Sequence, residues 1–430
     1  MKNPSELLHR HILALLLMAV LCLPVTADSA DQASPLSLSD CISTALSHST
    51  AILTAENDVV AAKSRSTSAK SSYLPQMSVQ NNTFVWGSGG VLNKSTTGTA
   101  FAVTQNVWDG GLREAGVRHA NYGVTQSTAG LSRTQQSVVF NVSKAYYEAL
   151  RARHLAAVAQ SNVTYSEGLR DQVVARAEEG EAARIDVLPV EAQLASAHVS
   201  LLSAQNSVRT SIIQLQNLMG LESQPGFDVL DVSDDDALPI ESLDDYIAAA
   251  VQSRPDILES KAATGASAAS VKSARIALYP RPNISADYQR QIQGGFTSSS
   301  SQMVGSIVFD IFNGNANRAA YKEARANQSS AQLQEQQVLR DIRAQVEEAY
   351  LNLINTKQRI TASDASLQAA KSNYEAQRER YSLGLGTVLD LLNAEVQVIT
   401  AQSDVVQARY DNYTAISQME YAVGRQRGAK

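Results

Sequence analysis

Apolar residues recur every three or four positions along four stretches of the chain, which is the spacing of one face of an α-helix. Two of these stretches are very long, about 112–179 and 316–382, and shorter ones follow at about 185–218 and 388–423. At 1.5 Å per residue, a helix of about 67 residues is near 100 Å long. That length exceeds any ordinary globular domain, so the pattern predicts an elongated, mainly helical protein.

A 3.5-residue repeat is clear in the last helical stretch. Its apolar positions are Leu389, Leu392, Val396, Ile399, Val406, Tyr410 and Tyr413. The earlier short stretch repeats this spacing with Ile185, Leu188, Ala192, Ala195, Val199 and Leu202. The repeat predicts long antiparallel coiled-coil helices that bury a narrow seam. The other positions are mainly small and polar, which suits a hollow wall of helices, although a plain extended coiled coil would show the same periodicity.

Four short segments alternate between apolar and polar residues, as β-strands with one wet face do. They cover about 76–86, 99–108, 283–292 and 303–312. Each is about ten residues long, the length of a tilted membrane strand. The third has Ile284, Ala286 and Tyr288 on one face. The second places Phe101, Val103 and Val107 together, and the fourth Ile307, Phe309 and Ile311. Alternation of this kind is typical of a membrane β-barrel with a polar lumen.

Aromatic residues mark the ends of these segments. Tyr73, Trp108, Tyr279 and Phe312 fall at one end of the two predicted hairpins, and Trp86 and Phe296 fall at the other. Two aromatic girdles are expected at the interfaces of a membrane barrel; a soluble β-subdomain with an aromatic core is the alternative. Four strands cannot close a barrel, because known single-chain barrels need about eight or more. A membrane location therefore implies that several copies share one barrel.

The sequence contains an internal duplication, in which the two halves align with an offset of 204–205 residues. Pro75 matches Pro280, Gly180 matches Gly384, and Asp186 matches Asp390. The first repeat covers 28–222, with its hairpin at about 76–108 and a tip turn at about 180–186. The second covers 240–430, with its hairpin at about 283–312 and a tip turn at about 384–390. Each repeat is expected to open with a helix, about 38–73 and 243–279. An acidic linker, 223–239, joins them.

The N-terminus has the features of a secretory signal peptide. Basic residues precede the apolar run from Ile12 to Leu23, and Val25-Thr26-Ala27 offers a cleavage site, so residues 1–27 are expected to be removed. Leu21 before Cys22 disfavours lipoprotein processing, which requires a small residue there. Only Cys41 then remains, and no intramolecular disulfide can form.

Composition excludes several classes of function. The net charge of −6 argues against nucleic acid as the main partner. The histidines lack metal-site spacing, and no phosphate-binding Gly-Lys-Ser/Thr loop occurs. The sequence therefore predicts neither an enzyme nor a cofactor or metal site.

The tip turns carry the most specific motif of the chain, Arg380-Tyr381-x-x-Gly384-x-x-Thr387-x-x-Asp390-Leu391-Leu392. Gly384 can end one helix in a left-handed conformation. Thr387 can cap the next helix, with Asp390 near its positive end. The first copy has Ala183 where Thr387 stands, so Asp186 is expected to cap in its place and the two tips to differ in shape.

This motif, the duplicated plan and the signal peptide together resemble the TolC family of outer-membrane efflux and type I secretion proteins over the whole mature chain. The resemblance implies a homotrimer in the Gram-negative outer membrane, with twelve strands in one barrel and an α-helical barrel through the periplasm. It also implies passive export of drugs, small molecules or polypeptides, delivered by an inner-membrane ABC or RND-type pump and a periplasmic adaptor protein. A soluble periplasmic coiled-coil adaptor or scaffold is the alternative.

The resemblance also assigns roles to single residues. The tunnel would be constricted by Asp390, with Asn393 and Asp186 nearby; Asn393 stands where an aspartate is expected, so a double acidic ring is replaced by a single one. Adaptor contacts would lie at the tips, at Gly180, Glu181, Gly384, Leu385, Gly386 and Thr387. The six aromatic residues at the strand ends would contact outer-membrane lipid.

Overall fold

The computed structural model describes residues 35–88, 91–181, 183–222, 226–232, 241–293 and 295–425. The signal peptide expected at 1–27 lies outside the described residues, and so does most of the acidic linker expected at 223–239. Those two predictions therefore stay predictions.

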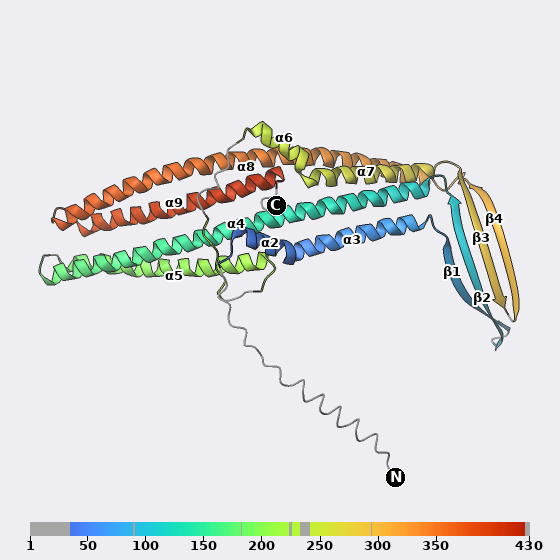
Figure 1. Cartoon of the computed structure of the whole chain (residues 1–430), viewed down its shortest axis with the longest axis horizontal. Coiled ribbons are helices and arrows are strands. Elements are labelled where there is room, and N and C mark those ends of the chain that lie inside the picture. Colours follow the sequence, from blue (N-terminus) through green and yellow to red (C-terminus); the bar gives the residue numbers. More distant parts are fainter. Residues whose placement is uncertain are drawn as a thin grey trace, which may run out of the picture.

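The chain forms a long helical body with a small sheet at one end (Figure 1). The helices are α2 (Leu38–His48), α3 (Thr50–Ser71), α4 (Leu112–Glu178), α5 (Val187–Leu218), α6 (Leu243–Ser253), α7 (Pro255–Ile276), α8 (Ala316–Ser382) and α9 (Val388–Val423), with a short 3-10 turn η1 (Arg184–Asp186) before α5. The strands are β1 (Gln76–Ser88), β2 (Val91–Trp108), β3 (Arg281–Gln293) and β4 (Phe296–Val308). The predicted fold class, mainly α with a small β part, is confirmed.

The helices form one layer whose order is the same as that of the strands. Near the sheet, α3 contacts α4, α4 contacts α7, and α7 contacts α8. Toward the other end, α5 and α9 flank α4, and α9 also packs on α8 (Figure 1). The sheet order is β1-β2-β3-β4, with all neighbours antiparallel. Each layer therefore has two free edges, with β1, α3 and α5 on one side and β4 and α8 on the other.

The sheet has one apolar and one polar face. Met77, Val103 and Tyr288 are cross-strand neighbours and share the apolar face. Thr104, Asp287 and Gln302 form a polar row on the opposite face. The alternation predicted for β3 is therefore present, and its two faces continue into β2 at Val103 and Thr104, whereas Ser301 of β4 lies opposite Tyr288.

Two strand predictions were wrong in extent. The fourth strand was expected at 303–312 but spans Phe296–Val308, because Phe296 already pairs with Gln293 at the end of β3. Its serine-rich start lacks an apolar alternation, so only the pairing with β3 reveals it. The second strand was expected at 99–108 but spans Val91–Trp108. A register shift between Asn106 and Trp108 interrupts the alternation that was predicted to continue to Val107.

The opening helix of each repeat is broken, contrary to the continuous helices expected at 38–73 and 243–279. Ser49 is extended (φ −62°, ψ 121°) between α2 and α3. Arg254 is extended between α6 and α7, because Pro255 at the first position of α7 disfavours helical geometry in the residue before it. Arg254 is buried and pairs with Asp256 at 2.5 Å, so this break is a fixed bend of the chain.

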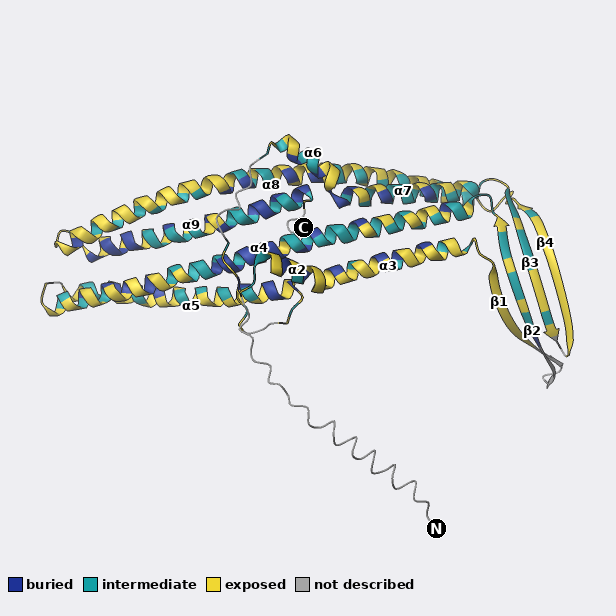
Figure 2. Ribbon diagram, in the orientation of Figure 1, coloured by how far each residue is buried: buried dark blue, intermediate teal, exposed yellow. Residues whose placement is uncertain are grey.

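The buried seams also differ from the predicted ones. On α9 the buried residues include Val388, Leu391, Leu392 and Glu395, whereas Leu389 and Val396 are exposed. On α5 the residues facing α4 include Val190 and Ala197, and the predicted seam lies on the exposed side (Figure 2). The 3.5-residue repeat of α5 therefore marks a face that α4 leaves uncovered, whereas on α9 Leu392 and Tyr410 of the predicted repeat are buried.

Close packing of α7 on α4 depends on one glycine. A Cβ added to Gly265 would lie 2.5 Å from Cε1 of Tyr122. We expect Gly265→Ala to lower the free energy of unfolding by about 1–3 kcal/mol, because the ring or the helix must move. Gly123→Ala on α4 meets nothing within 4 Å and should be neutral or stabilising, because alanine favours helix. Thermal unfolding of both variants tests this; equal effects would contradict the packing argument.

Candidate functional site

The turn between α8 and α9, which we call the second tip, is built as the sequence predicts. Gly384 is left-handed (φ 71°), and the N–H of Leu385 donates to the carbonyl of Arg380 at 2.8 Å. Thr387 caps α9: its hydroxyl accepts from the N–H of Asp390 at 3.2 Å and donates to the Asp390 carboxylate at 2.8 Å. The hydrogen bonds from Thr387 hold the pKa of the exposed Asp390 carboxyl below its usual range.

The turn between α4 and α5, which we call the first tip, differs in shape from the second tip, as predicted. The expected cap by the Asp186 side chain is not the cause of this difference. Gly180 is left-handed (φ 78°), and the N–H of Glu181 donates to the carbonyl of Arg176 at 2.8 Å, so the helix ends alike in both tips. Asp186 occupies the cap position of α5, but its side chain makes no capping hydrogen bond, and the expected capping role is wrong. Instead, the 3-10 turn η1 leads directly into α5. Pro189 lies in the first turn of α5.

The two tips are tied together by a small apolar cluster. It consists of Leu169, Val173, Val190, Tyr381, Val388, Leu391 and Leu392. Arg176 of α4 covers it: its guanidinium donates to the carbonyl of Tyr381 at 3.2 Å and lies 5.1 Å from the centre of the Tyr381 ring. Any separation of the two helical hairpins at this end must break these contacts.

A polar group that the sequence analysis did not single out lies one turn further along α9. Glu395 is 3 % exposed, accepts one hydrogen bond from Ser166 of α4 at 3.4 Å, and leaves its second carboxylate oxygen without a partner in the described part of the chain. Burial raises the pKa of the Glu395 carboxyl to about 7. The spacing Val388, Leu391, Leu392, Glu395 places it on the buried face, and this helical spacing could have revealed it.

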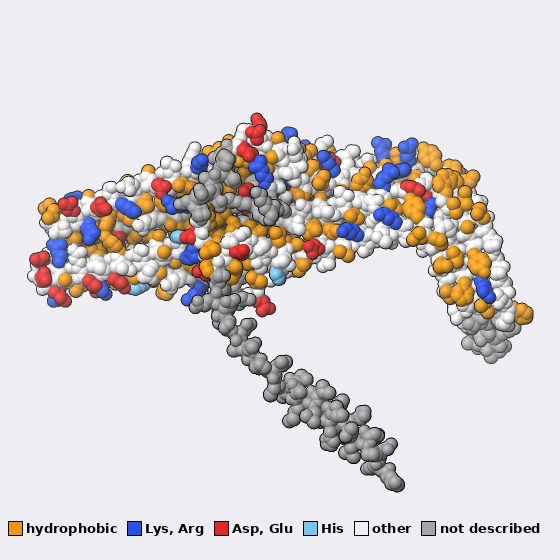
Figure 3. All heavy atoms as spheres, viewed as in Figure 1, with side chains coloured by type: hydrophobic (Ala, Val, Ile, Leu, Met, Phe, Trp, Pro, Cys, Tyr) orange, Lys and Arg blue, Asp and Glu red, His pale blue; other side chains and the backbone are white. Residues whose placement is uncertain are grey.

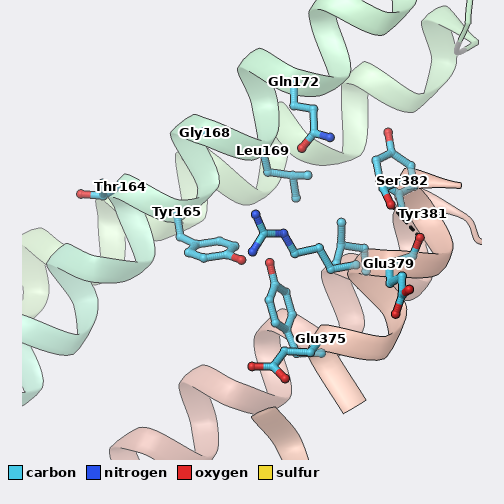
Figure 4. A pocket seen from close by; sticks show the side chains of 12 residues that line it. Thr164, Tyr165, Gly168, Leu169, Gln172, Glu375, Glu379, Tyr381 and Ser382 are labelled. Carbon is cyan, nitrogen blue, oxygen red and sulfur yellow. Dashed lines mark hydrogen bonds between the residues drawn. The ribbon is translucent and has the colours of Figure 1, made fainter. Parts of the chain in front are cut away.

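An open cavity of about 810 Å³ separates α4 from α8 beside this cluster (Figure 4). Thr164, Tyr165, Gly168, Leu169 and Gln172 come from α4, and Glu375, Glu379, Tyr381 and Ser382 from α8. Tyr165 meets Tyr374 edge to face, with ring centres 5.4 Å apart. The two hairpins are therefore in contact at the tip and again through the Tyr165–Tyr374 pair, with an open cavity beside this pair.

The aromatic residues expected at membrane interfaces lie on the surface. Tyr73, Trp108, Tyr279 and Phe312 are exposed where the helices meet the sheet, and Phe296 is exposed at the far end. Phe312 follows β4 by four residues instead of ending it. The side chain of Trp86 lies outside the described part of the structure.

The remaining site residues lie at the tips without being brought together. Asp390 and Asn393 are both exposed on α9, three positions apart, whereas Asp186 belongs to the first tip. Gly180, Glu181, Gly384, Leu385 and Thr387 are exposed, and Gly386 is half-buried against Arg380. Within one chain these residues form two separate turns, so any ring of charge requires further copies.

The free edges of the layer carry apolar surface. On η1 and α5, the predicted seam is exposed; it consists of Ile185, Leu188, Ala192, Ala195, Val199 and Leu202, and we call it the α5 stripe. It lies opposite the buried residues Val190 and Ala197, so it faces away from α4. Strands β1 and β4 present unpaired backbone groups at the edges of the sheet.

The described residues include no group of His, Cys, Asp and Glu side chains that could hold a metal ion. Among the same residues, no helix combines the length and apolar character needed to cross a bilayer.

Known proteins resemble the chain over nearly all of these elements. The model of the family "Outer membrane efflux protein" matches residues 41–221 and 246–425, which lie within the two predicted repeats. The outer membrane efflux protein BepC of Brucella suis is 26% identical over 363 residues, covering 83% of this chain and 78% of that protein. The outer membrane protein TolC of Escherichia coli is 22% identical over 366 residues, covering 80% and 73%.

Solved structures have the same fold. The crystal structure of CusC superposes with a TM-score of 0.81 at 17% identity, covering 90% of this chain and 92% of that chain. At this level of identity the match concerns the fold alone. It extends over the helical layer and the sheet together.

Proposed function

The chain belongs to the outer membrane efflux protein family, and from that premise we propose that three copies close edge to edge into one channel that runs from the tips to the sheet. The protein is an outer-membrane export channel with a large periplasmic part, and it is not an enzyme. Members of the family form trimers and work with inner-membrane pumps and adaptor proteins.

The observation that carries the closure is the shared order of the two layers. Because α3 and α5 lie on the same side as β1, and α8 on the same side as β4, one rotation about a common axis pairs all free edges at once. Three four-stranded sheets would give twelve strands, which is enough for a closed barrel. The polar face with Asp287 would line the lumen, and the face with Met77 and Tyr288 would contact lipid.

Substrate enters at the tips in this arrangement. The exposed tip residues, Gly180 and Glu181 in one turn and Gly384, Leu385 and Thr387 in the other, would contact the periplasmic adaptor. An ABC or RND-type pump would deliver the cargo. The conduit itself is passive, so the pump selects between drugs, other small molecules and polypeptides. Crosslinking from Leu385 to adaptor in cells tests this contact, and adaptor capture from mid-helix positions only would contradict it.

Asp390 is proposed to set the charge of the constriction. Three copies around the axis would concentrate negative potential there and favour cations. In planar bilayers, Asp390→Asn is expected to move the reversal potential in a salt gradient toward zero, because it removes the charge while asparagine can still accept a hydrogen bond from Thr387. Asp404→Asn, further along α9, serves as the control. Unchanged selectivity would leave Asp390 a purely capping residue.

A further inference from the structure

Exposed basic side chains gather where the helices meet the sheet, next to a broad apolar surface (Figure 3). We call this group the basic collar; it consists of Lys70 of α3, Lys272 and Arg275 of α7, and Arg318, Lys322 and Arg325 of α8. The nearby carboxylates of Asp109 and Asp310 are already paired, with Arg113 and Arg281, at 3.3 Å each. The carboxylate of Glu323 on α8 lines the groove against α7, on the other side of the helix. A chain with a net charge of −6 therefore concentrates unpaired positive charge at this one level.

The three collar residues of α8 point toward the free edge of the layer. They are spaced i, i+4 and i+7, so they form one stripe along the helix. Ala324 and Asn327 line the groove against α7, and Thr264 of α7 binds the Glu335 carboxylate at 2.8 Å, which fixes the side of α8 that faces α7. The stripe lies on the opposite side of α8, where each of its residues is exposed.

The last three turns of α3, residues 59–71, offer no carboxylate to this stripe from the neighbouring copy. Closure of the trimer brings α3 of the next protomer against α8, and residues 59–71 of α3 contain three basic residues and no Asp or Glu. Lys70 near the end of α3 would add to the positive charge. Like charges at this junction repel each other unless an anion lies between them.

The junction also lies at the depth of lipid headgroups. Arg318 to Arg325 lie about 3–14 Å along α8 from its first residue, at 1.5 Å per residue. Phe309, Ile311 and Phe312 lie between the sheet and Ala316, the first residue of α8. Their side chains are 51%, 89% and 81% exposed. Aromatic and apolar residues of this kind mark the boundary of a bilayer, and basic residues beside it attract anionic headgroups.

We propose that each junction between protomers binds the phosphate-bearing headgroup of an anionic phospholipid from the inner leaflet of the outer membrane. Arg318, Lys322 and Arg325 of one copy would contact the phosphate, with Lys70 of the next copy beside them, and the acyl chains would lie along the apolar belt. The site rests on the proposed trimer, because the junction exists only after closure. The lipid would act as a bridge that strengthens the assembly.

The test measures thermal dissociation of the purified trimer in detergent with phosphatidylglycerol, phosphatidylcholine or inorganic phosphate. Phosphatidylglycerol is expected to raise the dissociation temperature of the unmodified trimer by about 5 °C, and phosphatidylcholine by much less. The triple variant Arg318→Gln/Lys322→Gln/Arg325→Gln should lose most of that shift. Arg340→Gln/Arg343→Gln/Lys357→Gln changes charge equally on the same helix, further from the sheet, and should keep it.

Three outcomes would overturn the proposal: an equal shift with phosphatidylcholine, a full shift with phosphate alone, or a full shift in the collar variant. Single-channel conductance measured in neutral lipid tests the proposed channel independently of the lipid site. A conducting trimer without lipid preference would remove only the lipid site, whereas absence of any trimer would remove the channel as well.

Discussion

Replacing Val199 and Leu202 with aspartate is expected to abolish the trimer and its channel activity while the single chain keeps most of its helix. These residues are 64% and 65% exposed in one chain and lie in the middle of the α5 stripe. The described part of the chain leaves both side chains exposed, so their effect on the isolated fold should be small. Closure would bury them against α8 of the next copy.

The expected effect is large because it repeats at every junction. Burial of a Val or Leu side chain stabilises by about 1.5–3 kcal/mol. Placing an unpaired carboxylate there adds a desolvation penalty of several kcal/mol. Three junctions multiply both terms, which is more than a marginally stable assembly tolerates.

The control is Ser200→Asp with Ser207→Asp, two exposed positions about a quarter turn from the α5 stripe. It adds the same charge to the same helix and should leave the trimer intact. Size-exclusion chromatography with light scattering measures the assembly, and circular dichroism the helix content. A trimer that survives in the stripe variant would show that α5 does not lie at the junction.

Stability is expected to fall as pH rises from about 5 to about 8, and Glu395 should be a main cause. Its carboxyl has a pKa of about 7 in the folded chain, against an ordinary value of 4.5. The folded state therefore holds this proton through a range in which the unfolded chain has lost it. The resulting loss of stability begins above the unfolded value and is complete above about pH 7, where it amounts to roughly 3 kcal/mol.

Glu395→Gln should remove this dependence, because the amide carries no charge to bury. The variant is expected to match the unmodified protein near pH 5 and to exceed its unfolding temperature near pH 8. Glu191→Gln is the matched control, since Glu191 is the equivalent residue of the first repeat and is exposed on α5. Identical pH profiles for the unmodified protein and Glu395→Gln would contradict the assigned pKa.

Periodicity was enough to predict the long helices and the β-hairpins, because each depends on spacing within one segment. The ends of α8 and α9 match the prediction closely, and the cap of α9 by Thr387 follows from local chemistry alone. The start of β4 could not be predicted in the same way. Its serines form a strand because they pair with β3. Their own sequence has no apolar alternation from which this pairing could be predicted.

The α5 stripe shows a second limit of sequence reasoning. A heptad repeat reports that a face is apolar, but not which neighbour covers it. On α5 the buried residues Val190 and Ala197 lie opposite the stripe. The repeat on α5 marks a face that the described part of one chain leaves exposed, and the proposed trimer would cover it.

Native mass spectrometry of the detergent-solubilised protein, combined with single-channel recording of the same fraction, tests the account most directly. The edge-to-edge closure of β1 with β4 and of α3 and α5 with α8 predicts that the conducting particle holds three chains. A stable particle of one chain that keeps its helices and opens channels would contradict it.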